Sequence, residues 1–157
     1  MRDTIHLNPA DFDDWDGLLA LLTDAFAYMN GRIDPPSSLL RMTADNLRRK
    51  AGQEDLFLIR RNLRPIACLF GQPQGDHYYI GKLATAEDAR GTGLAWALMN
   101  AAIQQAAQRG LAGLELQTRV ELSENHRAFR AMGFRLVAAS THTGHARATS
   151  VTFRRSL

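Results

Sequence analysis

The strongest constraint on the fold lies between residues 77 and 106, where the sequence predicts a strand, a short turn and a long helix in direct succession. Residues 77–84 are rich in Tyr, Ile and Leu, which is typical of a strand. The turn that follows contains the run Arg90-Gly91-Thr92-Gly93-Leu94-Ala95. Apolar residues then recur at helical spacing, at Leu94, Leu98, Ala102 and Ala106, and Gly110 is expected to end the helix.

A glycine-rich turn at the beginning of a helix can bind an anion. The N–H groups of the first helical turn have no partner within the helix, and the peptide dipoles add roughly half a positive charge there. Gly91 and Gly93 carry no side chain that would block a ligand. The turn therefore predicts a phosphate or pyrophosphate site. The alternative is a tight strand–helix turn whose glycines serve packing alone.

The spacing of the turn distinguishes between phosphate ligands. No Lys-Ser or Lys-Thr pair follows the glycines, so the turn is not a nucleoside-triphosphate P-loop. The third small residue of a dinucleotide-binding GxGxxG motif is also missing. Arg90, Gly93 and Ala95 instead match the pattern of Gln or Arg, two residues, Gly, one residue, and Gly or Ala. This pattern resembles the acetyl-CoA pyrophosphate loop of the GNAT N-acetyltransferase superfamily.

A second motif, Asn125-x-x-x-Phe129-x-x-x-Gly133-Phe134, strengthens the resemblance, because many superfamily members carry NxxxYxxxGF at this place. The resemblance implies that acetyl-CoA is the co-substrate. Its expected binding residues are Leu83, Ala84, Thr85, Arg90, Gly91, Thr92, Gly93, Leu94, Ala95, Asn125 and Phe129. Asn125 would cap the short helix and help to hold the pantetheine arm, or it would serve only as the cap. Phe129 departs from the usual Tyr, whose phenol often protonates the departing thiolate.

The element order predicts an α/β fold with a mixed, mostly antiparallel sheet flanked by helices, in a single domain over residues 1–157. Strands are expected at 4–8, 56–59, 66–70, 77–84, 114–117, 134–139 and 148–154. The 77–84 strand and the 114–117 strand are joined through a helix, so they should be parallel. Helices are expected after Asp11 or Asp13, from Thr43 to Gly52, and from Asn125 to Gly133. In the GNAT fold, the sheet splays in the middle and the cofactor lies in the gap.

Composition narrows the class of protein. The 157 residues are 45% hydrophobic and 22% charged, which is ordinary for a globular protein. A net charge of +3 suits an anionic cofactor without requiring nucleic acid, which is not expected as a partner. The single Cys68 lies in an apolar run and is expected to be buried. No apolar run approaches the length of a membrane span, and the acidic N-terminal region is unlike a secretory signal, so a cytoplasmic protein is expected.

Acyl transfer from a thioester to an amine needs a base for the amine proton and donors for the developing oxyanion. By resemblance, the oxyanion donor is a backbone amide around Leu83 to Thr85. Tyr79 occupies the place of a glutamate base found in some members, and it is the first catalytic candidate. The alternative is that Tyr79 has only a structural role in the strand. Glu121, which follows the next strand, is the second catalytic candidate. The alternative is that it is an exposed loop residue without a role in catalysis. His77 and His126 are further candidates, against a surface histidine and a helix-turn residue respectively. Asp34 in the RIDPPSS segment would either attract a cationic amine or, as its place favours, serve as a capping or turn residue.

Two functions are consistent with these sequence features. The first is an N-acetyltransferase that moves an acetyl group from acetyl-CoA to an amine of a small molecule or peptide by direct attack, with no metal. The alternative is a non-catalytic acyl-CoA-binding module of the same fold, which Phe129 favours. The acceptor site is expected around residues 26–42 and the C-terminal hairpin. A homodimer is compatible with either function.

Overall fold

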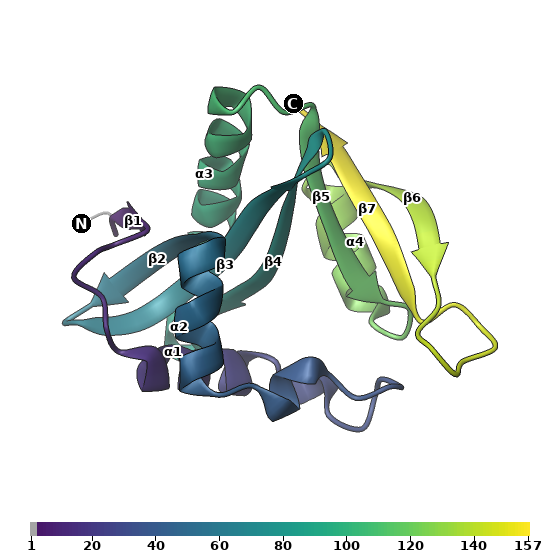
Figure 1. Cartoon of the computed structure of the whole chain (residues 1–157), viewed down its shortest axis with the longest axis horizontal. Helices are drawn as coiled ribbons and strands as arrows, with labels where there is room; N and C mark the ends of the chain where they lie inside the picture. Colours follow the sequence, from purple (N-terminus) through teal and green to yellow (C-terminus); the bar gives the residue numbers. More distant parts are fainter. Residues whose placement is uncertain (1–2) are drawn as a thin grey trace.

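A computed structural model describes residues 3–157, which form one seven-stranded sheet with helices on both faces (Figure 1). The strands are β1 (Ile5–Leu7), β2 (Asp55–Arg61), β3 (Arg64–Gln74), β4 (His77–Thr85), β5 (Gly113–Arg119), β6 (Arg135–Ser140) and β7 (Ser150–Ser156). The helices are α1 (Trp15–Ala25), α2 (Ala44–Gln53), α3 (Leu94–Gln108) and α4 (Ser123–Ala131), with short 3-10 turns η1 (Ala27–Met29), η2 (Ser38–Arg41) and η3 (Glu87–Ala89).

The strand order is β1-β2-β3-β4-β5-β7-β6, and every neighbouring pair is antiparallel except β4 and β5. The predicted mixed, mostly antiparallel sheet is therefore confirmed, as is the parallel pair at its centre. The meander of β2, β3 and β4 is also confirmed, and each of its strands is longer than the sequence pattern indicated.

The sheet splays between β4 and β5, as expected. The two strands pair over only three positions, of which the last is Tyr79 opposite Glu115. Beyond that point β4 continues to Thr85 beside β3, while β5 continues to Arg119 beside β7. Figure 1 shows the two halves of the sheet diverging from this short contact. The remaining backbone of β4 and β5 therefore borders a gap inside the sheet.

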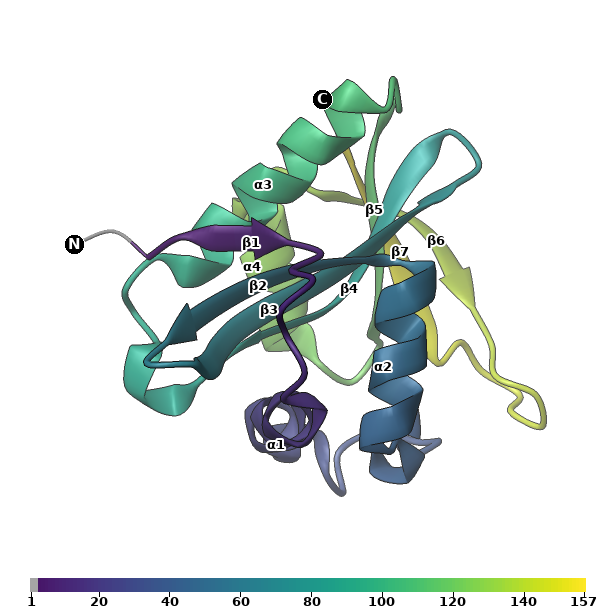
Figure 2. The same ribbon diagram turned by 60° about the vertical axis from the view of Figure 1, so that its left-hand side comes forward.

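Apolar residues form a core on each face of the sheet. Strand β2 contributes to both, since Phe57 and Ile59 pack toward α3 while Leu56 and Leu58 pack toward α1 and α2. A strand that is buried on both faces reads as a continuous apolar run, which is the pattern of residues 56–59. Figure 2 shows α1 and α2 on one side of the sheet and α3 on the other.

Several helix boundaries follow directly from side-chain chemistry. Thr43 caps α2 as predicted: its Oγ1 accepts from the Asn46 N–H, and the Asn46 side chain accepts from the Thr43 N–H. The predicted apolar stripe of α3 is buried throughout. Gly110 follows the end of α3 with a φ of +69°, a conformation that glycine adopts without strain.

Other boundaries differ from the prediction. Asp14, rather than Asp11 or Asp13, caps α1 by accepting from the Gly17 N–H, because Phe12 turns into the core and its ring packs against Trp15 just before the helix. Helix α2 passes through Gly52 and ends where the chain turns directly into β2. Strand β3 extends through Pro73 and Gln74, beyond its predicted end at residue 70, so only Gly75 and Asp76 separate it from β4.

The two halves of the C-terminal hairpin also shift slightly, to 135–140 and 150–156. Cys68 is fully buried, as expected, and burial raises the pKa of its thiol to about 12. Within residues 3–157, none of the helices has the length and apolar character needed to cross a membrane.

Candidate active site

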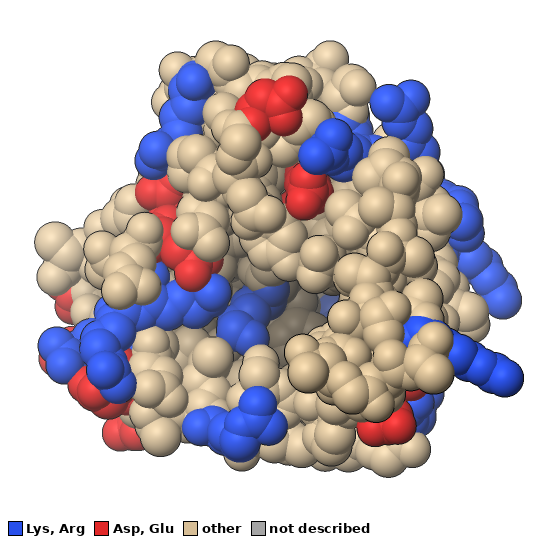
Figure 3. All heavy atoms as spheres, turned by 45° about the vertical axis from the view of Figure 1, so that its right-hand side comes forward, with Lys and Arg blue, Asp and Glu red and all other residues tan. Residues whose placement is uncertain are grey.

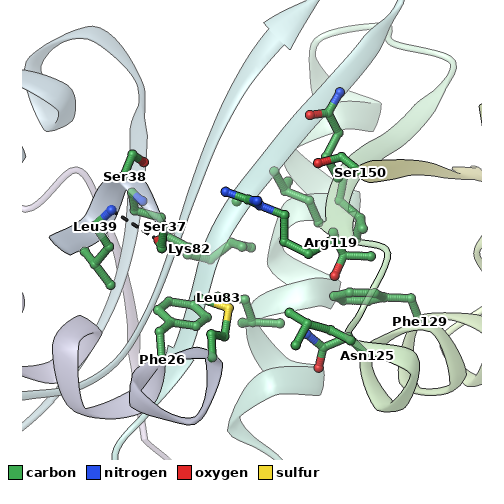
Figure 4. Close-up of a pocket in the computed structure, with 18 of the residues that line it drawn as sticks. Phe26, Ser37, Ser38, Leu39, Lys82, Leu83, Arg119, Asn125, Phe129 and Ser150 are labelled. Carbon is green, nitrogen blue, oxygen red and sulfur yellow. Dashed lines mark hydrogen bonds between the residues drawn. The ribbon is translucent and has the colours of Figure 1, made fainter. Parts of the chain in front are cut away.

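The gap between β4 and β5 opens into a cavity of about 340 Å³. Its walls come from both halves of the sheet, from α3 and α4, and from the segment between α1 and α2 (Figure 4). The lining residues are Phe26, Tyr28, Met29, Ser37, Ser38, Leu39, Leu69, Ile80, Gly81, Lys82, Leu83, Met99, Leu116, Gln117, Thr118, Arg119, Leu122, Asn125, Phe129, His142 and Ser150. Figure 3 shows the hollow from outside, with basic side chains within and around it.

A β-bulge shapes the β4 wall of the cavity. The register with β3 shifts between Cys68 and Phe70, and Lys82, on the opposite strand, has a φ of +52°. A bulge bends its strand and redirects side chains. Here it turns the segment 81–83 to line the cavity. Burial lowers the pKa of Lys82, and the positive charge of Lys50 lowers it further.

The predicted phosphate turn lies at the N-terminus of α3 with open space in front of it. Gly91 and Gly93 have φ values of +77° and +83°, and Gly93 is the N-cap residue of the helix. A Cβ atom added at either position would meet no heavy atom of residues 3–157 within 4 Å. The Thr92 hydroxyl donates to the Ala89 carbonyl at 2.5 Å and holds the turn closed. An anion can therefore approach the first-turn N–H groups without obstruction.

Asn125 has a different local role from the one predicted. Helix α4 begins at Ser123, after the buried Leu122, so Asn125 lies in the first turn and does not cap the helix. Its Nδ2 instead donates to the phenolic oxygen of Tyr28 at 3.0 Å. One helical turn later, Phe129 lines the cavity, and its ring packs against Phe134 with centroids 5.9 Å apart.

The RIDPPSS segment is fastened over one side of the cavity by the loop that follows β5. Arg32 forms an ion pair with Glu124, in which its Nη2 donates to both carboxylate oxygens at 2.9 Å. The Asp34 N–H donates to Oε2 of Glu121 at 3.0 Å. The Arg119 guanidinium donates to the carbonyls of Pro35 and Pro36. The segment therefore borders the cavity through its serines, Ser37 and Ser38.

The structure separates the catalytic candidates from one another. Tyr79 stands at the last β4–β5 pair, outside the cavity lining, and burial together with the Glu115 carboxylate raises its pKa. Glu121 contacts the Asp34 backbone, and its Oε1 is buried without a hydrogen-bond partner among residues 3–157.

The remaining candidates lie outside the cavity lining as well. The His126 ring nitrogen Nε2 lies 2.9 Å from the Arg119 carbonyl, and His77 lies beside Asp76 at the start of β4. The Asp34 side chain, expected to attract a cationic amine, is exposed and faces His145 at 3.4 Å.

Sequence analysis did not select Tyr28, Lys82, Arg119 or His142, all of which line the cavity. They come from four separate elements, and no spacing in the sequence connects them. Of these four residues, only Lys82 could have been singled out from the sequence. A lysine within an otherwise apolar strand is unusual, because lysine side chains are rarely buried in a core.

Comparisons with known proteins agree with this geometry. The family model described as "Acetyltransferase (GNAT) family" matches residues 15–134. No curated protein sequence matches the chain. Among solved structures, the chain resembles a GNAT family acetyltransferase from Elizabethkingia anophelis with acetyl-CoA bound, at 19% identity and a TM-score of 0.70, covering 99% of this chain and 98% of that one.

Two further structures share the fold. The chain resembles the ribosomal-protein-S18-alanine N-acetyltransferase from Escherichia coli at 18% identity and a TM-score of 0.66, covering 99% of this chain and 94% of that one. It also resembles an acetyltransferase of the GNAT family from Staphylococcus aureus at 12% identity and a TM-score of 0.71, covering 98% of this chain and 99% of that one.

Proposed function

Because the chain belongs to the GNAT acetyltransferase family, we propose that it is an acetyl-CoA-dependent N-acetyltransferase that acts on an amine of a small molecule or peptide. One observation supports this proposal above the others: β4 leads from the cavity wall at Gly81 to Leu83 directly into the open glycine turn of α3. A single ligand with a pyrophosphate and an extended arm fits both features at once.

The residues present suit acetyl-CoA. The N–H groups of Gly91 to Ala95 would bind the pyrophosphate, with the Arg90 side chain beside it, since the turn leaves room for an anion. The pantetheine arm resembles a peptide and would use the unpaired backbone of the gap, along Leu83, Ala84 and Thr85. Asn125 and Phe129 would border the arm on the opposite side of the cavity.

Acetyl-CoA, when bound, supplies a thioester whose acetyl carbon forms a bond to the amine nitrogen as the C–S bond breaks. Leu83 lines the cavity, and its backbone N–H is our candidate to donate to the carbonyl oxygen, where negative charge develops. Glu121 is our candidate to take up the amine proton through water, because its Oε1 lacks a partner within residues 3–157. Tyr79, with its raised pKa, stays protonated, so it would orient a water or the substrate rather than accept a proton.

The thiolate must gain a proton, and Phe129 has none to give. The Tyr28 hydroxyl lines the same cavity and is held beside Asn125, so we assign the proton transfer to Tyr28. The alternative function, a non-catalytic acyl-CoA-binding module, is favoured by Phe129 and by a cavity lining that, within residues 3–157, contains no carboxylate base.

Cofactor binding is tested by thermal unfolding with acetyl-CoA. Ligand at about 100 times its dissociation constant should stabilise the fold by about 2.7 kcal/mol. Gly93→Glu should abolish this stabilisation by placing a carboxylate in the turn. Gly75→Glu is the matched control, because Gly75 also has a positive φ and open surroundings but lies in the β3–β4 turn. No shift with millimolar acetyl-CoA would contradict the proposal.

Turnover then separates the two functions. Release of free thiol from acetyl-CoA is measured with a panel of amines. Amine-dependent thiol release supports the enzyme, whereas binding of acetyl-CoA without any such release across the panel supports the non-catalytic module.

A further inference from the structure

The cavity carries two positive charges on opposite walls. Lys82 projects from β4 and Arg119 from the end of β5, and in Figure 4 both lie between the Ser37–Leu39 segment and α4. The other polar lining groups among the described residues are hydrogen-bonding side chains, none of them a carboxylate: Ser37, Ser38, Gln117, Thr118, Asn125, His142, Ser150 and the phenol of Tyr28.

Neither charge is balanced by an acid. Within the described residues 3–157, no Asp or Glu lines the cavity, and neither Lys82 nor Arg119 takes part in an ion pair. The nearby acids lie outside the cavity lining. Glu124 pairs with Arg32, the exposed Asp34 lies by His145, and Glu121 accepts from the Asp34 N–H. Glu54, which favours the charged form of Lys82, pairs with Lys50. The described residues that line the empty space therefore include two cations, Lys82 and Arg119, and no carboxylate.

The Arg119 guanidinium is fixed in place before any ligand arrives. Two of its N–H groups donate to the Pro35 carbonyl at 2.7 Å and the Pro36 carbonyl at 3.4 Å. Carbonyl oxygens are neutral, so these bonds set its orientation and leave its charge available. A guanidinium with its remaining N–H groups held in one plane suits the two oxygens of a carboxylate.

The burial of the Lys82 ammonium group is energetically unfavourable, and a bound anion would offset this cost. Its side chain is largely withdrawn from water at the bulge of β4, and burial of an ammonium group without a counter-charge is unfavourable. A carboxylate placed between Lys82 and Arg119 would restore that lost solvation through charge-assisted hydrogen bonds.

We propose that the acceptor is a small amine that also carries a carboxylate, of the size of an amino acid, and that Lys82 and Arg119 bind this carboxylate. The proposal rests on the proposed N-acetyltransferase function. A cavity of about 340 Å³ must also hold the thioester end of acetyl-CoA, which limits the acceptor to a small molecule. The carboxylate takes no part in bond changes: the amine nitrogen gains the acetyl group and loses a proton, and the thiolate gains one.

The experiment compares acceptors that differ only in charge. Free amino acids, each paired with its carboxamide, are assayed by thiol release, and an aminoalkyl phosphonate is added to separate carboxylate recognition from general anion recognition. We expect kcat/KM to be higher for acid than for amide by about tenfold or more. Lys82→Met should bring this ratio close to one, while the Kd of acetyl-CoA stays within about twofold.

Two variants serve as controls. Lys82→Arg keeps the charge and should restore the preference for the acid. Lys50→Met removes the other lysine of the chain, which pairs with Glu54 outside the cavity. Because the Lys50 charge disfavours the charged form of Lys82, its removal should not weaken the preference for the acid.

Three outcomes would overturn the inference while leaving the N-acetyltransferase function in place. They are equal rates for acids and amides, a preference that survives Lys82→Met, and a phosphonate that is preferred over every carboxylate. A large loss of acetyl-CoA affinity in Lys82→Met would also overturn it, because the lysine would then serve the cofactor.

If acetyl-CoA binds and no amine in the panel turns over, the proposed function fails and the acceptor site is tested by binding. The CoA-bound protein is titrated with N-acetyl amino acids and their amides. Saturable binding of the acids alone, lost in Lys82→Met, supports the carboxylate site. Equal binding of acids and amides overturns it.

Discussion

The phenol of Tyr28 and the side-chain amide of Asn125 meet at the cavity although they are 97 positions apart in the chain. Asn125 Nδ2 lies 3.0 Å from the Tyr28 oxygen, and the Asn125 Oδ1 lies 3.4 Å from it. The contact joins η1 to the first turn of α4, next to Phe129. The chain therefore places the phenol of Tyr28 at the same cavity that Phe129 of α4 lines.

Tyr28→Phe should lower kcat by about tenfold or more, because general acid catalysis typically contributes 10²–10⁴ in rate and a thiolate needs less of that help than an alkoxide. The Kd of acetyl-CoA should change by less than about tenfold, which is the range of one net hydrogen bond. Steady-state kinetics and a binding titration on the same preparation measure both quantities.

Asn125→Ala tests how much depends on the position of the Tyr28 phenol. It removes the partner of Tyr28 while keeping the phenol, so its kcat should fall less than that of Tyr28→Phe. A kcat in Tyr28→Phe equal to that of the unmodified protein would show that Tyr28 only borders the cavity.

Asp55 forms the main buried polar network, at the opposite end of β4. Its carboxylate accepts from the Tyr78 phenol at 2.6 Å, Asn8 at 2.9 Å and Arg109 at 2.9 Å. Burial acts to raise the pKa of Asp55, but these donors together with Gln105 prevail and hold the pKa below its ordinary value. The folded state therefore binds this proton more weakly than the unfolded chain does.

Asp55→Asn should destabilise the fold by about 1–3 kcal/mol at pH 7, because Arg109 loses its ion-pair partner and a buried acceptor is lost. A depressed folded-state pKa gives stability that is complete above about pH 4 and is lost as the pH falls through the folded-state value. The difference between the two proteins in urea unfolding should accordingly shrink on going from pH 7 to below pH 4.

Asp45→Asn is the control for this measurement. Asp45 is exposed and pairs with Arg48 and Arg49 on the surface of α2, where water and salt screen the charges, so its loss should cost clearly less than the loss of Asp55. An equal cost for both variants at pH 7 would mean that the buried network contributes no more than a surface ion pair.

The parts of the fold that were predicted correctly depend on local patterns. The glycine turn of α3, the Thr43 cap and the buried stripe of α3 are all specified by residues within one or two helical turns. The gap between β4 and β5 was expected from the family resemblance, and β4 and β5 do separate after Tyr79. Local signals were less reliable where several candidates stand together, as in the acidic run before α1.

Residues 26–42 and the C-terminal hairpin, the expected acceptor regions, do contribute to the cavity lining. The individual side chains on this proposed acceptor side could not be predicted from the sequence, because they depend on contacts between distant loops. Arg119 reaches the Pro35 and Pro36 carbonyls from 84 and 83 positions away. A lysine within the predicted strand is unusual, but the bulge that brings Lys82 to the cavity has no signal of its own in the sequence. Asn125 was misplaced for a related reason: the buried Leu122 begins α4 one turn earlier than the polar Asn125 suggested.

Phe129→Tyr should fold normally and should hold or raise kcat. Phe129 is half-buried and lines the cavity, while its ring packs on Phe134 and Phe153 with centroids 5.9 Å and 6.3 Å away. The added hydroxyl extends from a ring that borders open space, so it can find water or substrate. Acetyl-CoA affinity should stay within a few fold, as measured by titration.

The decisive measurement places Phe129→Tyr in the Tyr28→Phe background. If a phenol at this cavity protonates the thiolate, the new hydroxyl in α4 should recover most of the kcat that Tyr28→Phe loses, because one proton donor replaces another. Failure to recover kcat, with folding and acetyl-CoA binding intact, would mean that Tyr28 acts by positioning Asn125. Loss of acetyl-CoA binding in Phe129→Tyr alone would mean instead that the hydroxyl enters apolar packing without a partner, and that the arm of the cofactor follows another path through the gap.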